Sequence, residues 1–284
     1  MSEYPFDHGK SWPARRGRRL AGGLTLRALI PNAITAGALC VGLTGIRFGI
    51  EAASIVDPVR SAAVWRFCVA AVILAGLLDG IDGRVARLLK AQSRFGAELD
   101  SLADSISFGV APALILYLWS LQHAPRLGWF AALAVAICCV LRLARFNARI
   151  ELEDQPLKSA GFLTGVPAPV GAGLAFLPMY LWVVTGSELF REPLPVGIWL
   201  VAVAFLMISS LPTLSWTKLR PRRNIRLELI AVAGLVIAGL LAEPWWTLVG
   251  ICAIYLALLP VGWIAYARVR RRASSLRGRA DEKP

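Results

Sequence analysis

The chain has 284 residues, of which 57% are hydrophobic and only 17% are charged. Soluble domains carry about 45–50% apolar and about 25% charged residues, and disordered chains are poorer still in apolar residues. The composition therefore excludes an ordinary soluble domain and a disordered chain. Because the apolar residues come in long runs, it indicates a membrane protein.

Eight apolar runs approach the roughly 20 residues that a membrane-spanning helix needs. They predict an all-α fold, a polytopic integral membrane helical bundle covering residues 28–268. A basic segment, residues 1–27, precedes it, and a basic tail, residues 269–284, follows. An amphipathic helix from about Arg15 to Leu29 is expected to lie on anionic head groups, with a disordered basic tail as the alternative. In chain order, the predicted spans are residues 28–50, 62–83, 97–121, 127–147, 165–186, 195–215, 226–242 and 244–267.

The distribution of basic residues predicts how these spans are oriented. The chain has 31 Lys and Arg against 18 Asp and Glu, a net charge of +13. Basic residues concentrate in cytoplasmic loops of membrane proteins. With the N-terminus placed in the cytoplasm, almost all of them fall on that side, so both termini are predicted to be cytoplasmic. Those that fall on the other side are Arg47, Arg60, Arg66, Arg126 and Arg191.

The sequence disfavours nucleic-acid binding, a zinc site and a disulfide framework. The basic residues are scattered over five segments and form no aromatic-interleaved patch, so we expect no nucleic acid. The five cysteines lie in apolar runs, with no ligand-like spacing to either histidine. A zinc site or a disulfide framework is therefore not expected.

Four aspartates stand out because they lie toward the predicted cytoplasmic ends of the second and third spans. Ionisable groups at membrane depth are costly and are candidates for function. On a helix, Asp79, Asp82 and Arg87 share one face, because they fall at positions i, i+3 and i+8. Small residues, Gly83 and Ala86, lie between them on that face and leave room for a ligand.

The third span carries a similar stripe, with Gly96, Asp100 and Asp104 spaced four residues apart. If the two helices pair antiparallel, all four carboxylates face one pocket and need compensating charge. Oxygen ligands indicate Mg²⁺ or Mn²⁺ rather than zinc. Two alternatives are salt bridges to arginines without a metal, and a proton relay in a transporter.

At these positions the sequence resembles the CDP-alcohol phosphotransferases, which are integral membrane enzymes. Residues 79–104 match the signature D-x-x-D-G-x-x-A-R-x8-G-x3-D-x3-D at every fixed position. Further similarity runs from Pro31 to Pro169 and points to the bacterial, serine-accepting branch. It includes Pro31-Asn32 and Thr35, residues 105–113, residues 142–147 and residues 165–169.

The resemblance implies an enzyme of phospholipid biosynthesis in the bacterial inner membrane. It implies transfer of the phosphatidyl group from CDP-diacylglycerol to L-serine, with CMP as the second product, by a homodimer. It also implies a core of six helices, to which two C-terminal helices are added here. Other acceptors in the same chemistry, namely glycerol 3-phosphate, inositol or an inositol phosphate, stay open.

The resemblance also assigns roles to residues of this sequence. Asp79, Asp82, Asp100 and Asp104 match the carboxylates of a two-metal site. Asp104 is the position taken as general base, and Asp100 is the second catalytic carboxylate beside it. The positions expected to bind the cytidine diphosphate portion are Asp79, Gly83, Ala86, Arg87 and Gly96, together with Ser93, which the signature does not fix.

Arg142 and Arg145 are candidates for the acceptor side. They lie three residues apart at the end of the fourth span and therefore share a helix face. A cation on this face is suited to the carboxylate of serine. The alternative is that both arginines only anchor the cytoplasmic end of the helix.

Overall fold

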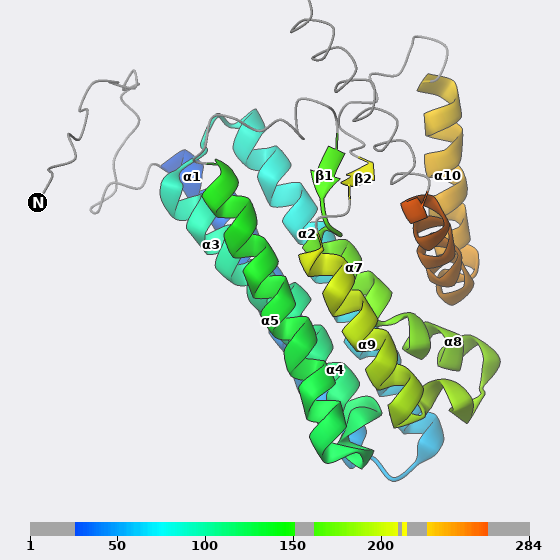
Figure 1. Cartoon of the computed structure of the whole chain (residues 1–284). Helices are drawn as coiled ribbons and strands as arrows, with labels where there is room; N and C mark the ends of the chain where they lie inside the picture. Colours follow the sequence, from blue (N-terminus) through cyan, green and yellow to red (C-terminus); the bar gives the residue numbers. More distant parts are fainter. Residues whose placement is uncertain (1–25, 151–161, 210–211, 215–225, 261–284) are drawn as a thin grey trace, which may run out of the picture.

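The computed structural model describes residues 26–150, 162–209, 212–214 and 226–260. Its elements form an elongated bundle of helices that run roughly side by side (Figure 1). The first half comprises α1 (Leu26–Ser54), α2 (Pro58–Leu88), α3 (Arg94–Asp104), η1 (Ser105–Val110), α4 (Ala111–Trp119), η2 (Leu121–His123) and α5 (Pro125–Ile150). The second half comprises β1 (Phe162–Thr164), α7 (Ala168–Ala175), α8 (Leu177–Thr185), η3 (Glu188–Arg191), α9 (Pro193–Ile208), β2 (Pro212–Leu214), α10 (Arg226–Ala242) and a last helix, Pro244–Pro260.

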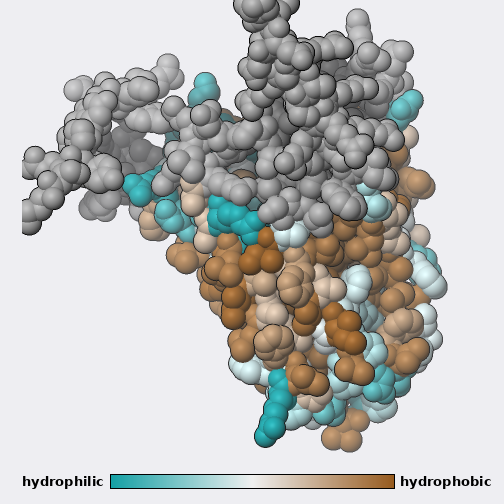
Figure 2. Space-filling view, in the orientation of Figure 1, coloured by the Kyte–Doolittle hydropathy of each residue, from teal (hydrophilic) through white to brown (hydrophobic). Residues whose placement is uncertain are grey.

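The predicted polytopic membrane bundle is confirmed. Apolar side chains cover the middle of the visible face, and hydrophilic ones gather toward its two ends (Figure 2). Large hydrophobic residues such as Leu77, Phe130 and Phe205 are more than half exposed, which is expected where lipid is the solvent. Within the described ranges, five segments are long and apolar enough to cross a membrane: Leu29–Ser54, Pro58–Leu88, Arg94–Trp119, Pro125–Ala148 and Ala168–Thr185. The same ranges hold three shorter apolar helices, Pro193–Ile208, Ile230–Ala242 and Pro244–Pro260.

The second helix is longer at both ends than the predicted span of residues 62–83. Asp57 caps its start by accepting a hydrogen bond from the Val59 amide, and Pro58 occupies the first turn, where its missing N–H costs nothing. The helix then continues to Leu88. Asp79 and Asp82 therefore lie inside a regular helix, more than one turn before its end at Leu88.

The third span is interrupted immediately after Asp104. The chain widens there into the π-helix η1 and then returns to α-helical geometry in α4. Pro112 follows in the first turn of α4, and a proline inside a helix removes one backbone donor and clashes with the carbonyl four residues earlier. A π-turn accommodates that conflict, and such turns are frequent at functional sites.

The sixth helix ends at Ile208, well before the predicted end at residue 215. The chain then forms β2, which pairs antiparallel with β1 and adds a small non-helical element to the predicted all-α fold. Pro212 lies four residues beyond Ile208, and a helix continued through it would lose a backbone hydrogen bond, so the proline disfavours the longer helix. The fifth helix begins at Ala168 rather than residue 165, because Gly165 has a positive φ of 74° and Pro167 follows.

Several expectations concern residues outside the described ranges. These are the amphipathic helix up to Thr25, the basic segments except for Leu26 and Arg27, and the predicted end of the eighth span after Pro260.

The end of the bundle around η2 and η3 is held together by Arg191. Its Nε donates a hydrogen bond to the Trp119 carbonyl at 3.0 Å, and its guanidinium lies over the rings of Trp119 and Trp182. The Ser120 hydroxyl in turn donates to the Arg191 carbonyl at 2.6 Å. These contacts join the third, fifth and sixth helical segments at the end opposite to the aspartates.

The turn between α4 and α5 leaves no space for a side chain at residue 128. A Cβ atom there would lie 2.2 Å from the Leu121 carbonyl oxygen. We expect Gly128→Ala to lower the free energy of unfolding by about 1–3 kcal/mol, the usual cost of overpacking. Gly37→Ala is the matched control, because a Cβ at Gly37 meets nothing within 4 Å. Thermal unfolding in detergent measures both, and equal midpoints for the two variants would contradict the tight turn.

Candidate active site

Three carboxylates converge where α2 faces α3. Oxygen atoms of Asp79, Asp82 and Asp100 lie within 4.8 Å of one another. The Asp82 carboxylate is buried, with 3% of the residue exposed, and the other two residues are half-buried. Asp104 extends this group, since its carboxyl group lies within hydrogen-bonding reach of Asp79. The structure therefore brings together all four aspartates that the sequence selects.

Local structure explains how the two acidic stripes meet. Asp79 and Asp82 are one turn apart on α2, and Asp100 and Asp104 are one turn apart on α3. Ser93 begins α3 as its N-cap, because its hydroxyl accepts a hydrogen bond from the Gly96 amide at 3.0 Å. Helix α1 packs against both α2 and α3 and forms a wall that the acidic helices share.

The buried Asp82 carboxylate receives a hydrogen bond from α1. The Thr35 hydroxyl lies 2.6 Å from Asp82 Oδ2 and 3.1 Å from the Pro31 carbonyl oxygen. A hydroxyl has one proton, and the shorter, charge-assisted bond to the carboxylate is the stronger of the two. Thr35 therefore fixes the orientation of the Asp82 carboxylate.

A cavity of about 510 Å³ opens beside Asp82 and Asp100. A Cβ at Gly83 would meet nothing within 4 Å, so the glycine leaves open space in the cavity wall. At Gly96, by contrast, a Cβ would lie 2.9 Å from Asn32 Oδ1, so α1 and α3 approach closely there. The cavity is lined by Pro31, Asn32, Thr35, Asp82, Gly83, Ala86, Arg87, Ala91, Gln92, Ser93, Gly96, Ala97 and Asp100.

Most of the residues selected from sequence for the cytidine diphosphate portion line this cavity. Asp79 is the exception, because it and Asp104 are outside the lining. Asn32 and Thr35 of α1 line the cavity but received no role from sequence reasoning. The signal was present, since two polar residues three apart in the first apolar span must share a helix face.

The two candidate acceptor residues have different surroundings. Arg145 donates a hydrogen bond to the Ile208 carbonyl at the end of α9, so its guanidinium is engaged in joining α5 to α9. Arg142 lies within electrostatic reach of Asp104. Its Nε atom is buried and has no hydrogen-bond partner among the described residues. The structure therefore brings Arg142 within electrostatic reach of the acidic cluster and engages Arg145 at the end of α9.

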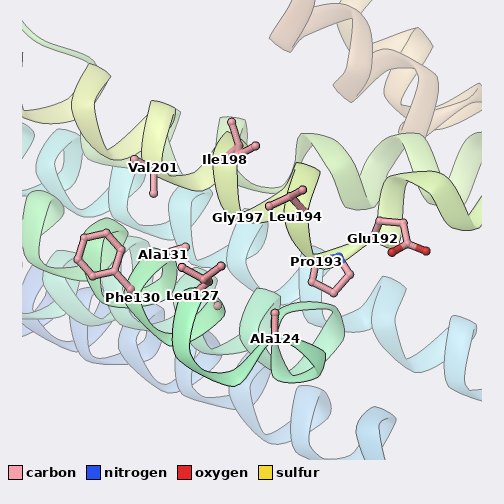
Figure 3. Close-up of a pocket in the computed structure, with 11 residues that line it drawn as sticks. Ala124, Leu127, Phe130, Ala131, Glu192, Pro193, Leu194, Gly197, Ile198 and Val201 are labelled. Atoms are coloured by element: carbon pink, nitrogen blue, oxygen red, sulfur yellow. The ribbon is translucent and has the colours of Figure 1, made fainter.

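A second cavity, of about 530 Å³, lies between the first turns of α5 and α9, away from the acids. Its wall consists of side chains such as Leu127, Phe130 and Ile198 (Figure 3). Among the described residues that line it, Glu192 is the only ionisable one. This cavity has no group suited to phosphate chemistry.

The charge and the donor atoms of the acidic cluster suit a divalent metal ion. Carboxylate oxygens this close repel one another strongly in an apolar surrounding. An all-oxygen donor set suits Mg²⁺ or Mn²⁺, and three oxygens within 4.8 Å of one another fit around one such ion. Arg87 on the cavity wall adds a cation suited to phosphate.

Comparison with known proteins places the chain among relatives of defined chemistry. The relative from Mycobacterium tuberculosis (strain H37Rv), named CDP-diacylglycerol–serine O-phosphatidyltransferase, is 36% identical over 259 residues, 88% of this chain and 84% of its own. The protein of the same name from Mycobacterium leprae is 35% identical over 82% of this chain and 73% of its own. The one from Bacillus subtilis is 32% identical over 64% of this chain and 88% of its own.

Family profiles match most of the described bundle. Residues 224–260 match a profile described as CDP-alcohol phosphatidyltransferase 2. Residues 28–217, which include the acidic cluster and its cavity, match the profile of CDP-alcohol phosphatidyltransferase. The chain therefore belongs to the CDP-alcohol phosphatidyltransferase family of membrane enzymes.

Proposed function

We propose that this enzyme transfers the phosphatidyl group from CDP-diacylglycerol to the hydroxyl of L-serine, giving phosphatidylserine and CMP. The names of the mycobacterial relatives support serine as the acceptor. The observation that carries the proposal is the acidic cluster at the edge of a cavity that holds Arg87. Phosphoryl transfer depends mainly on positioning and on neutralising charge, and this arrangement serves both needs.

The acidic cluster is proposed to hold the divalent metal. Asp79, Asp82, Asp100 and Asp104 would supply carboxylate ligands to Mg²⁺ or Mn²⁺ in a two-metal site. When bound, the metal supplies neutralisation of the charge that develops on the phosphate oxygens. Thr35 keeps the Asp82 carboxylate in one orientation, and its hydrogen bond to Oδ2 leaves lone pairs of the carboxylate free for a ligand.

The cavity is proposed to take the cytidine diphosphate portion of the lipid donor. Arg87 would bind a phosphate through its forked N–H groups. Gly83 and Ala86 leave space beside it, and Gly96 keeps α1 and α3 close. Asp79 is proposed to contact the donor through the metal, whereas Ser93 would contact it only through a hydroxyl that already caps α3.

Proton transfer is proposed to use Asp104, with Asp100 beside it. The Asp104 carboxylate takes the proton of the serine hydroxyl. The serine oxygen then forms a bond to the phosphorus that carries the diacylglycerol, and the bond from that phosphorus to CMP breaks. Arg142 lies near Asp104 and is the candidate for holding the serine carboxylate. Arg145, already bonded to Ile208, would act on the acceptor only through its charge.

The same proposal includes the setting of the enzyme. The basic loops support an inner-membrane protein with both termini and the active site on the cytoplasmic side. Serine and CMP are water-soluble, so a site at that side is accessible to both. The resemblance to the family is our reason for including a homodimer in this proposal.

An acceptor panel tests the proposed reaction. Purified protein with CDP-diacylglycerol should release CMP with L-serine, and should release little with glycerol 3-phosphate, inositol or inositol phosphate. A chelator should abolish the release, because the carboxylates then repel without compensation, and added Mn²⁺ or Mg²⁺ should restore it. CMP release without any acceptor, or release that survives chelation, would contradict the proposal. Release with another acceptor and none with L-serine would contradict serine as the acceptor.

Asp104→Asn tests the proton acceptor. The amide cannot accept the serine proton, so we expect kcat to fall about 10²–10⁴-fold. Asp57→Asn is the control, because Asp57 caps the far end of α2 and asparagine caps a helix about as well as aspartate. CMP release measures both variants, and substantial turnover in Asp104→Asn would remove the assignment of the base.

Thr35→Val tests the orientation of Asp82. Valine keeps the shape and removes the donor, so we expect the Kd for Mn²⁺ to rise about 10–100-fold. Thr44→Val is matched, since Thr44 donates its hydroxyl to the carbonyl four residues earlier on the same helix and touches no carboxylate. Electron paramagnetic resonance of free Mn²⁺ gives the Kd without reliance on turnover. An unchanged Kd in Thr35→Val would contradict the role given to this hydrogen bond.

A further inference from the structure

The last helix, Pro244–Pro260, packs one stripe of side chains against the bundle. Leu248, Cys252, Tyr255 and Leu259 all contact the core and repeat at helical spacing. Cys252 is buried, and its thiol lies 3.7 Å from the Gly173 carbonyl of α7. Since Tyr255 follows Cys252 by three residues, it lies on the same face and points into the bundle.

A second contact fixes how this helix is docked. Trp245, in its first turn, packs against the fully buried Tyr180 of α8, with ring centroids 6.4 Å apart. Together with Cys252, this contact attaches the helix at two points along its length. The position of Tyr255 is therefore set by the docking of the whole helix.

Two buried polar groups on different helices lack partners in this region. Among the described residues, neither the Tyr255 hydroxyl nor Arg142 Nε has a hydrogen-bond partner. The guanidinium and the phenol lie within electrostatic reach of each other. A buried donor without a partner is costly, and two such donors within electrostatic reach of each other are suited to one bound oxyanion.

The location of this pair separates it from the donor cavity. Arg142 lies near Asp104, the proposed proton acceptor, and Asp104 is outside the lining of the cavity that holds Arg87. Neither Arg142 nor Tyr255 lines that cavity. An oxyanion held by the pair would thus lie on the Asp104 side of the acidic cluster, and not on the side of the cavity that Arg87 lines.

We propose that Tyr255 and Arg142 together bind the carboxylate of the amino-acid acceptor, an inference that rests on the proposed function. The Tyr255 hydroxyl donates to one carboxylate oxygen and Arg142 Nε donates to the other. The guanidinium neutralises the carboxylate charge, and the acceptor hydroxyl is directed toward Asp104. The C-terminal helix is then part of the acceptor site and determines which acceptor is used.

Tyr255→Phe tests this binding in the full-length protein in mixed micelles. The variant removes one hydroxyl and keeps the ring, so the helix should stay docked with an unchanged thermal midpoint. We expect the KM for L-serine to rise about tenfold or more, as for the loss of a hydrogen bond to a charged group, while the KM for CDP-diacylglycerol stays the same. L-serinamide, which lacks the carboxylate, should be used equally well by the variant and the unmodified protein.

Two further variants make the result specific. Tyr117→Phe is the matched control, since it removes the hydroxyl of a tyrosine whose ring packs edge-on against Trp129 at the far end of the bundle. Arg142→Lys keeps the positive charge and removes Nε, and it gives a second reading if Tyr255→Phe is unstable. If both groups hold one carboxylate, the double variant should raise the KM for serine by less than the product of the single effects.

The outcomes separate this inference from the proposed function. An unchanged KM for serine in Tyr255→Phe, with an active unmodified protein, overturns only the inference. A raised KM for CDP-diacylglycerol instead would assign the oxyanion to the lipid phosphate and would also overturn it. If the unmodified protein releases no CMP with serine, the proposed function fails before any variant is compared, and the inference fails with it.

Discussion

Repulsion among carboxylates gathered inside an apolar bundle is the constraint on which the site depends. Two like charges about 4 Å apart repel by about 4 kcal/mol at the effective dielectric of a protein near its surface. Asp79, Asp82 and Asp100 are held this close by two helices, and Asp104 adds a fourth charge. Thr35 and Arg142 offset part of the repulsion from the protein itself. The bundle therefore holds an unfavourable arrangement of charges that a bound cation would relieve, as proposed above.

The bundle separates two approaches to this cluster. On one side, α1 closes a cavity with α2 and α3, and Arg87 stands on its wall. On the other side, α5 brings Arg142 within electrostatic reach of Asp104, and the C-terminal helix brings Tyr255 within electrostatic reach of Arg142. A phosphoryl transfer needs its attacking and leaving groups on opposite sides of phosphorus. In the proposed mechanism, helices from both halves of the chain would therefore contribute to one reaction centre, although the family signature lies entirely within residues 79–104.

The sequence was sufficient for the features that follow from helical periodicity. Asp79 and Asp100 could be placed on facing stripes because spacing alone determines a helix face. The partner of Asp82 could not be found in this way, since Thr35 is 47 residues away and only the packing of α1 joins them. The proposed role of Tyr255 could not be found from spacing either, because the sequence around it is apolar like that around any core tyrosine. Span ends were misjudged where local chemistry overrides hydropathy, as at the Asp57 cap and before Pro212.

The π-helix after Asp104 links the site to the core in one further respect. Each residue added to or removed from a helix rotates everything beyond it by about 100°. Within Ser105–Val110, Phe108 packs beside Gly76 and Gly109 packs against Cys139. The core contacts therefore require one rotation of the helix about its axis, whereas the direction of Asp104 requires another. The π-helical turn provides the difference in rotation between these two parts of the helix. A relative that lost a residue here could keep either its core or its acidic stripe in register, so we expect the length of this segment to be more constrained than its composition.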